Sequence, residues 1–385
     1  MADTEDVRMQ KRYIAKARTK PGRCGRSLWL GSIVVSLLVA HAGAAGPIQV
    51  LQRPGTTSLE QVHCLAYSPD GKLLAVGSSA PSLVKGEFPG DDRLPEGTIE
   101  LWDLGTGKRT STLRQSAKSE HGDNLNQVGA IAFSPDGKWL IGGDVTGYTL
   151  WELAAGTQKL KWRSGMVEPL SPGWSPDGKW IALPTMVQPE APPYEMDPHG
   201  VALVSATTGK PAMFFPVVIG YPRAARISPD GRLLATAGHD CTVRVFDTRA
   251  LTNVFSDFTE TTLFAVGFSP DGRYLLAGSS WGGVLCIYDV HVGDQGISIS
   301  KRGQSAPGAG ELHSLEFTRD GKRALSNSSI GLVLWDTATW GTFKILKQAR
   351  GCLSPDGNRI AVARESTPTA IEVFTLADLE KSMVP

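Results

Sequence analysis

One pentapeptide of this sequence has the pattern that hydrolases use to hold a nucleophilic serine. Gly278-Ser279-Ser280-Trp281-Gly282 fits Gly-x-Ser-x-Gly, in which the middle serine attacks a carbonyl carbon from a sharp turn between a strand and a helix. Here short apolar runs flank the motif on both sides, so we place it in a hairpin turn between two strands. We interpret the match as chance, and we predict no catalytic residue and no enzymatic activity.

Two polar pairs, Asp91-Asp92 and Asp123-Asn124, have the oxygen-rich chemistry that calcium prefers. Neither has the regular ligand spacing of a calcium-binding loop, so solvated loop charge is the better interpretation. Asn327-Ser328-Ser329 fits the acceptor pattern for an N-linked glycan, but we give it little weight in a chain of bacterial type. We predict no metal and no cofactor.

The cysteines show no ligand spacing. Cys64, Cys241, Cys286 and Cys352 are far apart, without Cys-x-x-Cys or Cys-x-x-Cys-His, which argues against zinc, thioredoxin-like and covalent haem chemistry. Two disulfides are an alternative in an oxidising compartment. Each cysteine lies in or beside a predicted strand, however, where a lone cysteine behaves as a small apolar residue. We therefore favour buried free thiols.

The element that positions every other residue is a recurring turn. Ser-Pro-Asp-Gly or a close relative occurs seven times, with five of the six gaps between 36 and 53 residues and the other 66. Proline presets the first corner, aspartate can hydrogen-bond the local backbone, and glycine takes the positive φ that closes a hairpin. A turn at this period indicates a repeat architecture. The aspartates, one per repeat and therefore unable to converge on a metal, are Asp70, Asp136, Asp177, Asp230, Asp271, Asp320 and Asp356.

Each repeat has four apolar runs of strand length. In the second repeat the predicted strands are 128–133, 138–142, 148–153 and 158–162. Four antiparallel strands repeated seven times predict an all-β fold, a seven-bladed β-propeller over residues 46–385. One helical turn is expected near its end, at 377–381.

The ends of the predicted propeller complement each other. The last repeat has strands at 351–353, 358–362 and 370–374 and then stops one strand short, whereas residues 47–51 form a strand with no repeat of their own. We predict that this N-terminal strand completes blade seven as its outer strand and closes the ring, which hides a sheet edge.

At this point the chain resembles the Trp-Asp (WD) repeat family of propellers, over nearly all of residues 47–380. The resemblance implies a seven-bladed scaffold that binds partners, usually proteins, and that rarely catalyses. The family's buried network of His, Ser or Thr, Asp and Trp is incomplete, since Phe246 replaces the tryptophan in the repeat that keeps Thr236 and Asp240. The strand tryptophans Trp102, Trp139, Trp151, Trp180 and Trp335 are expected in the core. The resemblance rests on Leu101-Trp102-Asp103, Leu150-Trp151-Glu152, Val245-Phe246-Asp247, Ile287-Tyr288-Asp289 and Leu334-Trp335-Asp336.

The long insertions fall mostly on one face of the predicted propeller. The Ser-Pro-Asp-Gly turns open on one face, and the insertions at 80–97, 114–127, 184–200 and 304–310 belong to connections that open on the other. Long loops on a rigid frame often carry function, and neutral elaboration is the equal alternative. The residues predicted to bind a partner are Phe88, Asp92, Arg93, His121, Met186, Tyr194, Glu195 and His199, with Lys85 beside them.

We therefore expect a monomeric, non-enzymatic interaction scaffold that binds a protein partner through this loop-rich face. The alternative is a propeller with a ligand-binding or hydrolytic site at the mouth of its central channel. That alternative needs a convergent set of Asp, Glu, His or Arg on the innermost strands. The sequence offers no such set, because Val62-His63-Cys64 and Leu312-His313-Ser314 stand isolated.

Residues 1–45 have the organisation of a secretory signal peptide. A basic segment with eight Lys and Arg precedes the uncharged run 28–40 and the small residues 42–46, and cleavage is expected after Ala44. An uncleaved membrane anchor is the alternative, although its apolar core is shorter than the ~20 residues of a spanning helix. Both place the propeller outside the cytoplasm, as a periplasmic, secreted or membrane-anchored protein.

Charge argues against a nucleic-acid partner. Without residues 1–45 the chain has 31 Lys and Arg against 35 Asp and Glu, a net formal charge of −4. A nucleic-acid-binding protein would favour a strongly basic face. Contact with a membrane is expected only through an uncleaved N-terminal segment.

Overall fold

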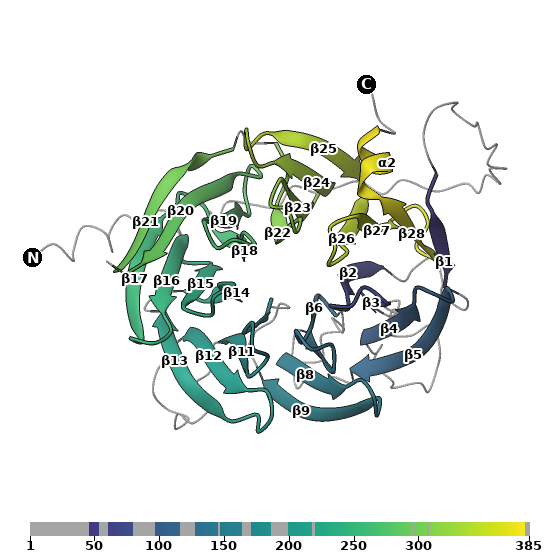
Figure 1. Ribbon diagram of the computed structural model, residues 1–385, viewed down its shortest axis with the longest axis horizontal. Helices are drawn as coiled ribbons and strands as arrows, with labels where there is room; N and C mark the ends of the chain where they lie inside the picture. The colour runs from purple at the N-terminus through teal and green to yellow at the C-terminus, as the bar shows by residue number, and fades with distance from the viewer. Residues whose placement is uncertain are drawn as a thin grey trace, which may run out of the picture. The chain divides into compact units, whose positions relative to one another are not determined.

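The computed structural model describes residues 46–53, 61–79, 97–115, 128–144, 147–163, 171–185, 199–217, 220–294, 296–305 and 308–381. In this part of the chain there are 28 strands and one short helix, α2 (Leu376–Lys381). The strands form seven separate four-stranded antiparallel sheets, which stand around a ring with one strand of each sheet toward the middle (Figure 1). The predicted seven-bladed, all-β propeller is confirmed.

Each sheet is one blade, numbered along the chain. Blades one to three are β2 (Val62–Tyr67), β3 (Leu73–Ser78), β4 (Gly97–Asp103) and β5 (Lys108–Gln115); β6 (Ala130–Phe133), β7 (Trp139–Asp144), β8 (Gly147–Glu152) and β9 (Thr157–Arg163); and β10 (Gly173–Trp174), β11 (Trp180–Thr185), β12 (His199–Ser205) and β13 (Pro211–Val217).

Blades four to six are β14 (Pro222–Ile227), β15 (Leu233–Gly238), β16 (Thr242–Asp247) and β17 (Thr252–Phe258); β18 (Leu263–Phe268), β19 (Tyr274–Ser279), β20 (Leu285–Gly293) and β21 (Gly296–Gln304); and β22 (Leu312–Phe317), β23 (Arg323–Ser328), β24 (Gly331–Asp336) and β25 (Thr342–Lys347). Blade seven is β26 (Ala349–Leu353), β27 (Arg359–Arg364), β28 (Ala370–Thr375) and β1 (Gln49–Gln52).

The N-terminal strand closes the ring as predicted. β1 pairs antiparallel with β28, with Gln49 opposite Val373 and Gln52 opposite Ala370. Leu51 is fully buried between blade seven and blade one. The helical turn expected near residue 377 is α2, whose start is capped by Thr375, because its Oγ1 accepts a hydrogen bond from the Asp378 backbone N–H at 3.0 Å.

The recurring turns are built by the contacts that their residue types suggest. In the first turn, Asp70 Oδ1 accepts hydrogen bonds from the Ser68 hydroxyl at 2.6 Å and from the Lys72 backbone N–H at 3.1 Å. The Ser68 hydroxyl in turn accepts a bond from the Leu73 N–H at 2.9 Å. Gly71 has a φ of 69°, which favours glycine. The same pattern recurs in the other six turns.

The core lies between the blades. Seven clusters of buried apolar side chains each join two neighbouring blades, including blade seven to blade one. This explains why the inner strands are apolar on both faces rather than alternating. Trp102, Trp151 and Trp335 are buried as predicted, whereas Trp139 and Trp180 are half-buried.

The four described cysteines are free thiols as predicted, but only two of them are buried, and the core keeps one Trp–Ser contact of the expected polar network. Cys286 and Cys352 are buried, and Cys64 and Cys241 are half-buried. In blade six the Trp335 indole donates a hydrogen bond to the Ser326 hydroxyl at 3.0 Å. No helix among the described residues is long and apolar enough to cross a membrane.

Candidate binding site on the loop-rich face

The strand bounds define two faces of the propeller. The innermost strands begin at one end of the blades, which we call the loop-rich face. The opposite end carries the Ser-Pro-Asp-Gly turns, and we call it the turn face. Because antiparallel neighbours are connected at alternate ends, β3 ends and β4 begins on the loop-rich face, as do β11 and β12. The assignment of the insertions to connections of this face is confirmed.

Most of the predicted partner-binding residues lie outside the described residues, and their role stays a prediction. They are Lys85, Phe88, Asp92, Arg93, His121, Met186, Tyr194 and Glu195. His199 is described; it is the first residue of β12, at the loop-rich end of blade three.

Four innermost strands share an irregularity at their loop-rich end. In β2, β14, β18 and β22 the pairing with the next strand skips one residue, which bulges out of the ladder. These residues are His63, Arg223, Phe264 and His313, and each stands five positions before the Ser or Thr of the following turn. A bulge re-aims a side chain, and bulges are frequent beside functional sites. The repeat therefore presents equivalent, half-buried side chains from four blades.

Blade seven contributes a second arginine without a bulge. The pairing of β26 with β27 is regular, and Arg350 is the second residue of β26. The positive charge of Arg350 acts on both His63 and His313. We call His63, Arg223, Phe264, His313 and Arg350 the inner rim of the loop-rich face.

Aromatic rings connect the inner rim across blades four to six. The rings of Phe264 and His313 are nearly parallel, at 14°, with centroids 5.9 Å apart. The guanidinium carbon of Arg223 lies 4.0 Å from the centre of the Phe264 ring. His239, which directly follows β15, has its ring centroid 5.8 Å from that of Phe264 and 4.3 Å from that of Tyr221.

His199 extends this series into blade three. Its ring meets that of Tyr221 edge to face, with centroids 6.3 Å apart. Its Nδ1 is buried and has no hydrogen-bond partner among the described residues. The one described member of the predicted set therefore belongs to a row of rings that leads to the inner rim.

The arginines supply the charge of this site at neutral pH. Burial lowers the pKa of Arg223 to about 10, and the charge of Glu311 opposes this effect, so the guanidinium remains protonated. Burial, followed by the charge of a neighbouring arginine, lowers the pKa of His63, His239 and His313 to about 4. The three imidazoles are thus neutral at pH 7, and each offers one N–H donor and one acceptor.

One serine–histidine pair lies on the same face. His63 Nε2 is 2.9 Å from the Ser79 hydroxyl, directly after β3. A nucleophilic serine needs a histidine that accepts its proton and a third group that orients the ring. A histidine with a pKa of about 4 is a weak base at neutral pH. The lowered pKa of His63 therefore makes this pair a weak nucleophilic couple at neutral pH.

Two further charged residues of the inner strands have structural roles. Arg226 donates hydrogen bonds to the Pro172 carbonyl and the Ser171 hydroxyl, both at 2.8 Å, which ties the short β10 of blade three to blade four. Glu316 accepts a bond from the Leu353 N–H at 3.1 Å, which joins blades six and seven. Burial raises the pKa of Glu316 to about 7.

The expectation that His63 and His313 stand isolated is wrong. They are 250 residues apart in the sequence, but the charge of Arg350 lowers the pKa of both. Ring closure brings blade one beside blade seven, and a bulge holds each histidine at the loop-rich end of its innermost strand. The available signal was their identical distance from the following turn, which aligns them with Arg223 and Phe264.

The remaining motifs have structural settings. Ser279 is the last residue of β19 and Ser280 follows it in the hairpin turn to β20, as predicted, and not before a helix. The Asn327 amide donates to the Ser314 hydroxyl at 2.7 Å and to the Gly351 carbonyl at 2.9 Å, so it is engaged between blades. Among the described residues, no group of three or more His, Cys, Asp or Glu is placed to hold a metal ion.

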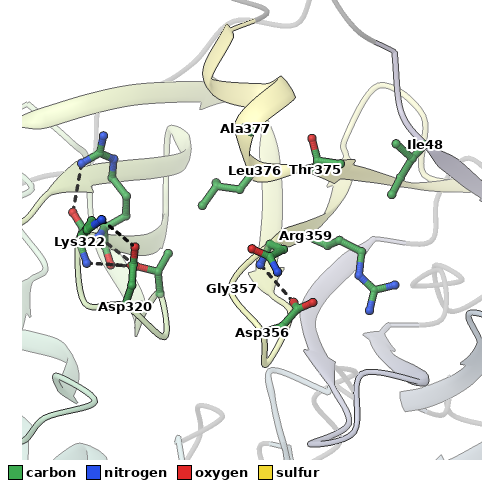
Figure 2. A pocket seen from close by; sticks show the side chains of 12 residues that line it. Ile48, Asp320, Lys322, Asp356, Gly357, Arg359, Thr375, Leu376 and Ala377 are labelled. Atoms are coloured by element: carbon green, nitrogen blue, oxygen red, sulfur yellow. Dashed lines mark hydrogen bonds and ion pairs between the residues drawn. The ribbon is translucent and has the colours of Figure 1, made fainter.

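The turn face has a cleft of about 590 Å³ between blades six and seven. Figure 2 shows that it separates Lys322 and Asp320 from Asp356 and Leu376. Its carboxylates are held within their own turns, and the Arg359 guanidinium donates to the Gly71 carbonyl of blade one at 3.3 Å. These charged groups serve the turns and the packing of the blades.

Comparison with known proteins identifies the repeats. The family described as WD domain, G-beta repeat matches residues 47–103, 113–146, 220–247 and 251–289. Protein HIR1 of Gibberella zeae is 36% identical over 79 residues, 17% of this chain and 8% of that protein. Protein groucho of Drosophila melanogaster is 25% identical over 186 residues, 48% of this chain and 24% of its own. The chain therefore spans less than a quarter of the length of these relatives.

Solved structures share the fold. A chain of the mitotic checkpoint complex superposes with a TM-score of 0.62 at 16% identity, over 92% of this chain and 99% of that one. The β-propeller domain of Cps50 (Swd1) from Myceliophteria thermophila gives the same score and identity over 82% and 97%. The chain therefore contains WD repeats within a seven-bladed β-propeller.

Proposed function

We propose that this chain is a non-enzymatic scaffold that binds a protein partner through its loop-rich face. WD-repeat propellers are typically protein-interaction scaffolds. The observation that carries the proposal is the inner rim. Its aromatic and basic side chains lie on the same face as the strand ends that the long insertions connect.

Exposed apolar side chains on that face support the proposal. Trp281, in the connection between β19 and β20, is 75% exposed, and Ile330, between β23 and β24, is 36% exposed. A large aromatic residue in water is costly, and tryptophan is enriched where partners bind. The turn face exposes Leu251 by 54%, but its short turns are otherwise made of polar groups that bond one another.

Site-specific photo-cross-linking tests the proposal. A photoreactive amino acid placed at Trp281 or Ile330 should give discrete adducts with another protein in the organism's own extract. The same residue placed at Lys138 or Lys322, on the turn face, should give none. Adducts that form only from the turn face would contradict the proposal.

We also propose that the propeller works outside the cytoplasm, after cleavage of the chain behind Ala44. The proposal rests on the basic, apolar and small-residue segments of that region. Intact-mass measurement of the natural protein should give a chain that begins at Ala45, four residues before β1. A full-length mass in a membrane fraction would support the anchored alternative instead.

A further inference from the structure

The inner rim brings two guanidinium groups to one imidazole. The charges of Arg350 and Arg223 both act on His313. The centre of the Phe264 ring lies 4.0 Å from the Arg223 guanidinium carbon and 5.9 Å from the centre of the His313 imidazole. All four side chains are half-buried and accessible to solvent. The Arg350 guanidinium donates no hydrogen bond to any residue that the structure describes.

These contacts select the charge of a ligand. Aromatic rings often bind cations, but Arg223 already lies over the Phe264 ring, so a second cation would meet like charge there. The acidic neighbours, Glu311 and Glu365, are exposed, where water and salt screen them. Partly buried guanidinium groups bind carboxylates and phosphates through paired N–H donors.

The rings define the shape of the ligand. Tyr221, His239, Phe264 and His313 form a continuous row across blades four to six, with neighbouring centroids 4.3 to 5.9 Å apart. Such a row offers a platform for the side chains on either side of an anionic group. In an extended peptide the side chains on one face are two residues apart, about 6.6 Å, which is close to the spacing of these rings.

We propose that the inner rim binds an extended acidic segment of a protein partner, with Arg223 and Arg350 holding its oxyanion and the row of rings contacting the adjoining residues. This inference rests on the proposed scaffold function, because the partner supplies the segment. A carboxylate and a phosphoryl group share the required chemistry, and the experiment separates them.

Fluorescence anisotropy with four labelled peptides tests the proposal. The peptides share Gly-Ser flanks and carry three central Glu, phosphoserine, Gln or Lys residues. The purified chain should bind the Glu or the phosphoserine peptide at least about tenfold more tightly than the Gln peptide, because charge-assisted hydrogen bonds are strong. Preference between the two anionic peptides identifies the oxyanion. Equal binding of Gln and Glu peptides, preference for Lys, or no binding at all would overturn the proposal.

Arginine variants assign the binding to the inner rim. Arg223→Gln and Arg350→Gln should each weaken anionic peptide binding about tenfold. Arg273→Gln is the matched control, since Arg273 pairs with Asp271 on the turn face. If a Gln variant fails to fold, the Lys variant keeps the charge without the planar fork and should still weaken binding. Unchanged peptide binding in folded variants would overturn this proposal. The scaffold function would still be supported if the photo-cross-links from Trp281 or Ile330 form.

Discussion

At the scale of single residues, the inner rim combines permanent charge with neutral rings. The histidines are held uncharged chiefly by burial, beside arginines that stay charged. Near neutral pH, two guanidinium groups therefore dominate the field at this site. This arrangement lowers the stability of the folded chain when the solution becomes acidic.

Acid should destabilise the propeller through these histidines. The unfolded chain takes up protons near pH 6.5, whereas folded His63 and His313 do so only near pH 4. Stability present above pH 6.5 is therefore lost as the pH falls toward 4. After discount for solvent screening, each histidine should account for about 1 kcal/mol. Urea denaturation at several pH values should show a shallower acid loss in His63→Gln and His313→Gln, with the exposed His291→Gln unchanged. Identical pH profiles would refute this.

Glu316 should have the opposite pH dependence. Burial raises its folded pKa from 4.5 to about 7, so its contribution to stability is present below pH 4.5 and is lost as the pH rises through 7. Glu316→Gln keeps an oxygen for the Leu353 N–H and removes the ionisation. Thermal unfolding at pH 8 should show this variant about 1 kcal/mol more stable than the parent. Exposed Glu365→Gln is the control, and a variant less stable at pH 8 would contradict the argument.

At the scale of elements, the turns are the clearest case of local chemistry that builds structure. Asp136 Oδ1 accepts the Ser134 hydroxyl at 2.6 Å and the Lys138 N–H at 3.1 Å. Asp136→Ala should lower the free energy of unfolding by about 1 kcal/mol, as the loss of such bonds usually does. Lys138→Ala removes only an exposed ion pair and should change little. Equal effects of the two variants in urea titrations would show that the carboxylate is dispensable.

The turns and strands could be predicted because their signals are local. In the second repeat the predicted strands agree with β6 to β9 to within two residues at each end. The bulges could not be predicted in this way, because a bulge depends on the register between two strands rather than on composition. Arg350 could not be aligned with the other rim residues from the sequence. Blade seven has no bulge, so Arg350 stands one position closer to its turn than the bulged residues do. The site on the inner rim was missed for these reasons, while the two faces were assigned correctly.

At the scale of the whole molecule, closure depends on more than the pairing of β1 with β28. Arg53, which follows β1, is buried and donates to Glu100 of blade one at 2.8 Å and to the Pro368 carbonyl of blade seven at 2.7 Å. Glu100 also accepts the Trp102 indole N–H at 3.2 Å. Strand pairing and a buried ion pair therefore join the two ends of the chain across the same pair of blades.

Breaking this ion pair should loosen the closure of the ring. Arg53→Met removes one of the two arginines that pair with the buried Glu100 at 2.8 Å; Arg109 remains, so the loss should fall below the ~3–5 kcal/mol that an unpaired buried charge typically costs. Arg53→Met combined with Glu100→Leu removes both charges and should recover much of that loss. Hydrogen exchange should locate the effect at β1 and β28, and Gln52→Ala, an exposed neighbour, should leave both strands protected. If the double variant is as unstable as the sum of the single ones, the two side chains do not act as a pair and closure rests on the strand ladder alone.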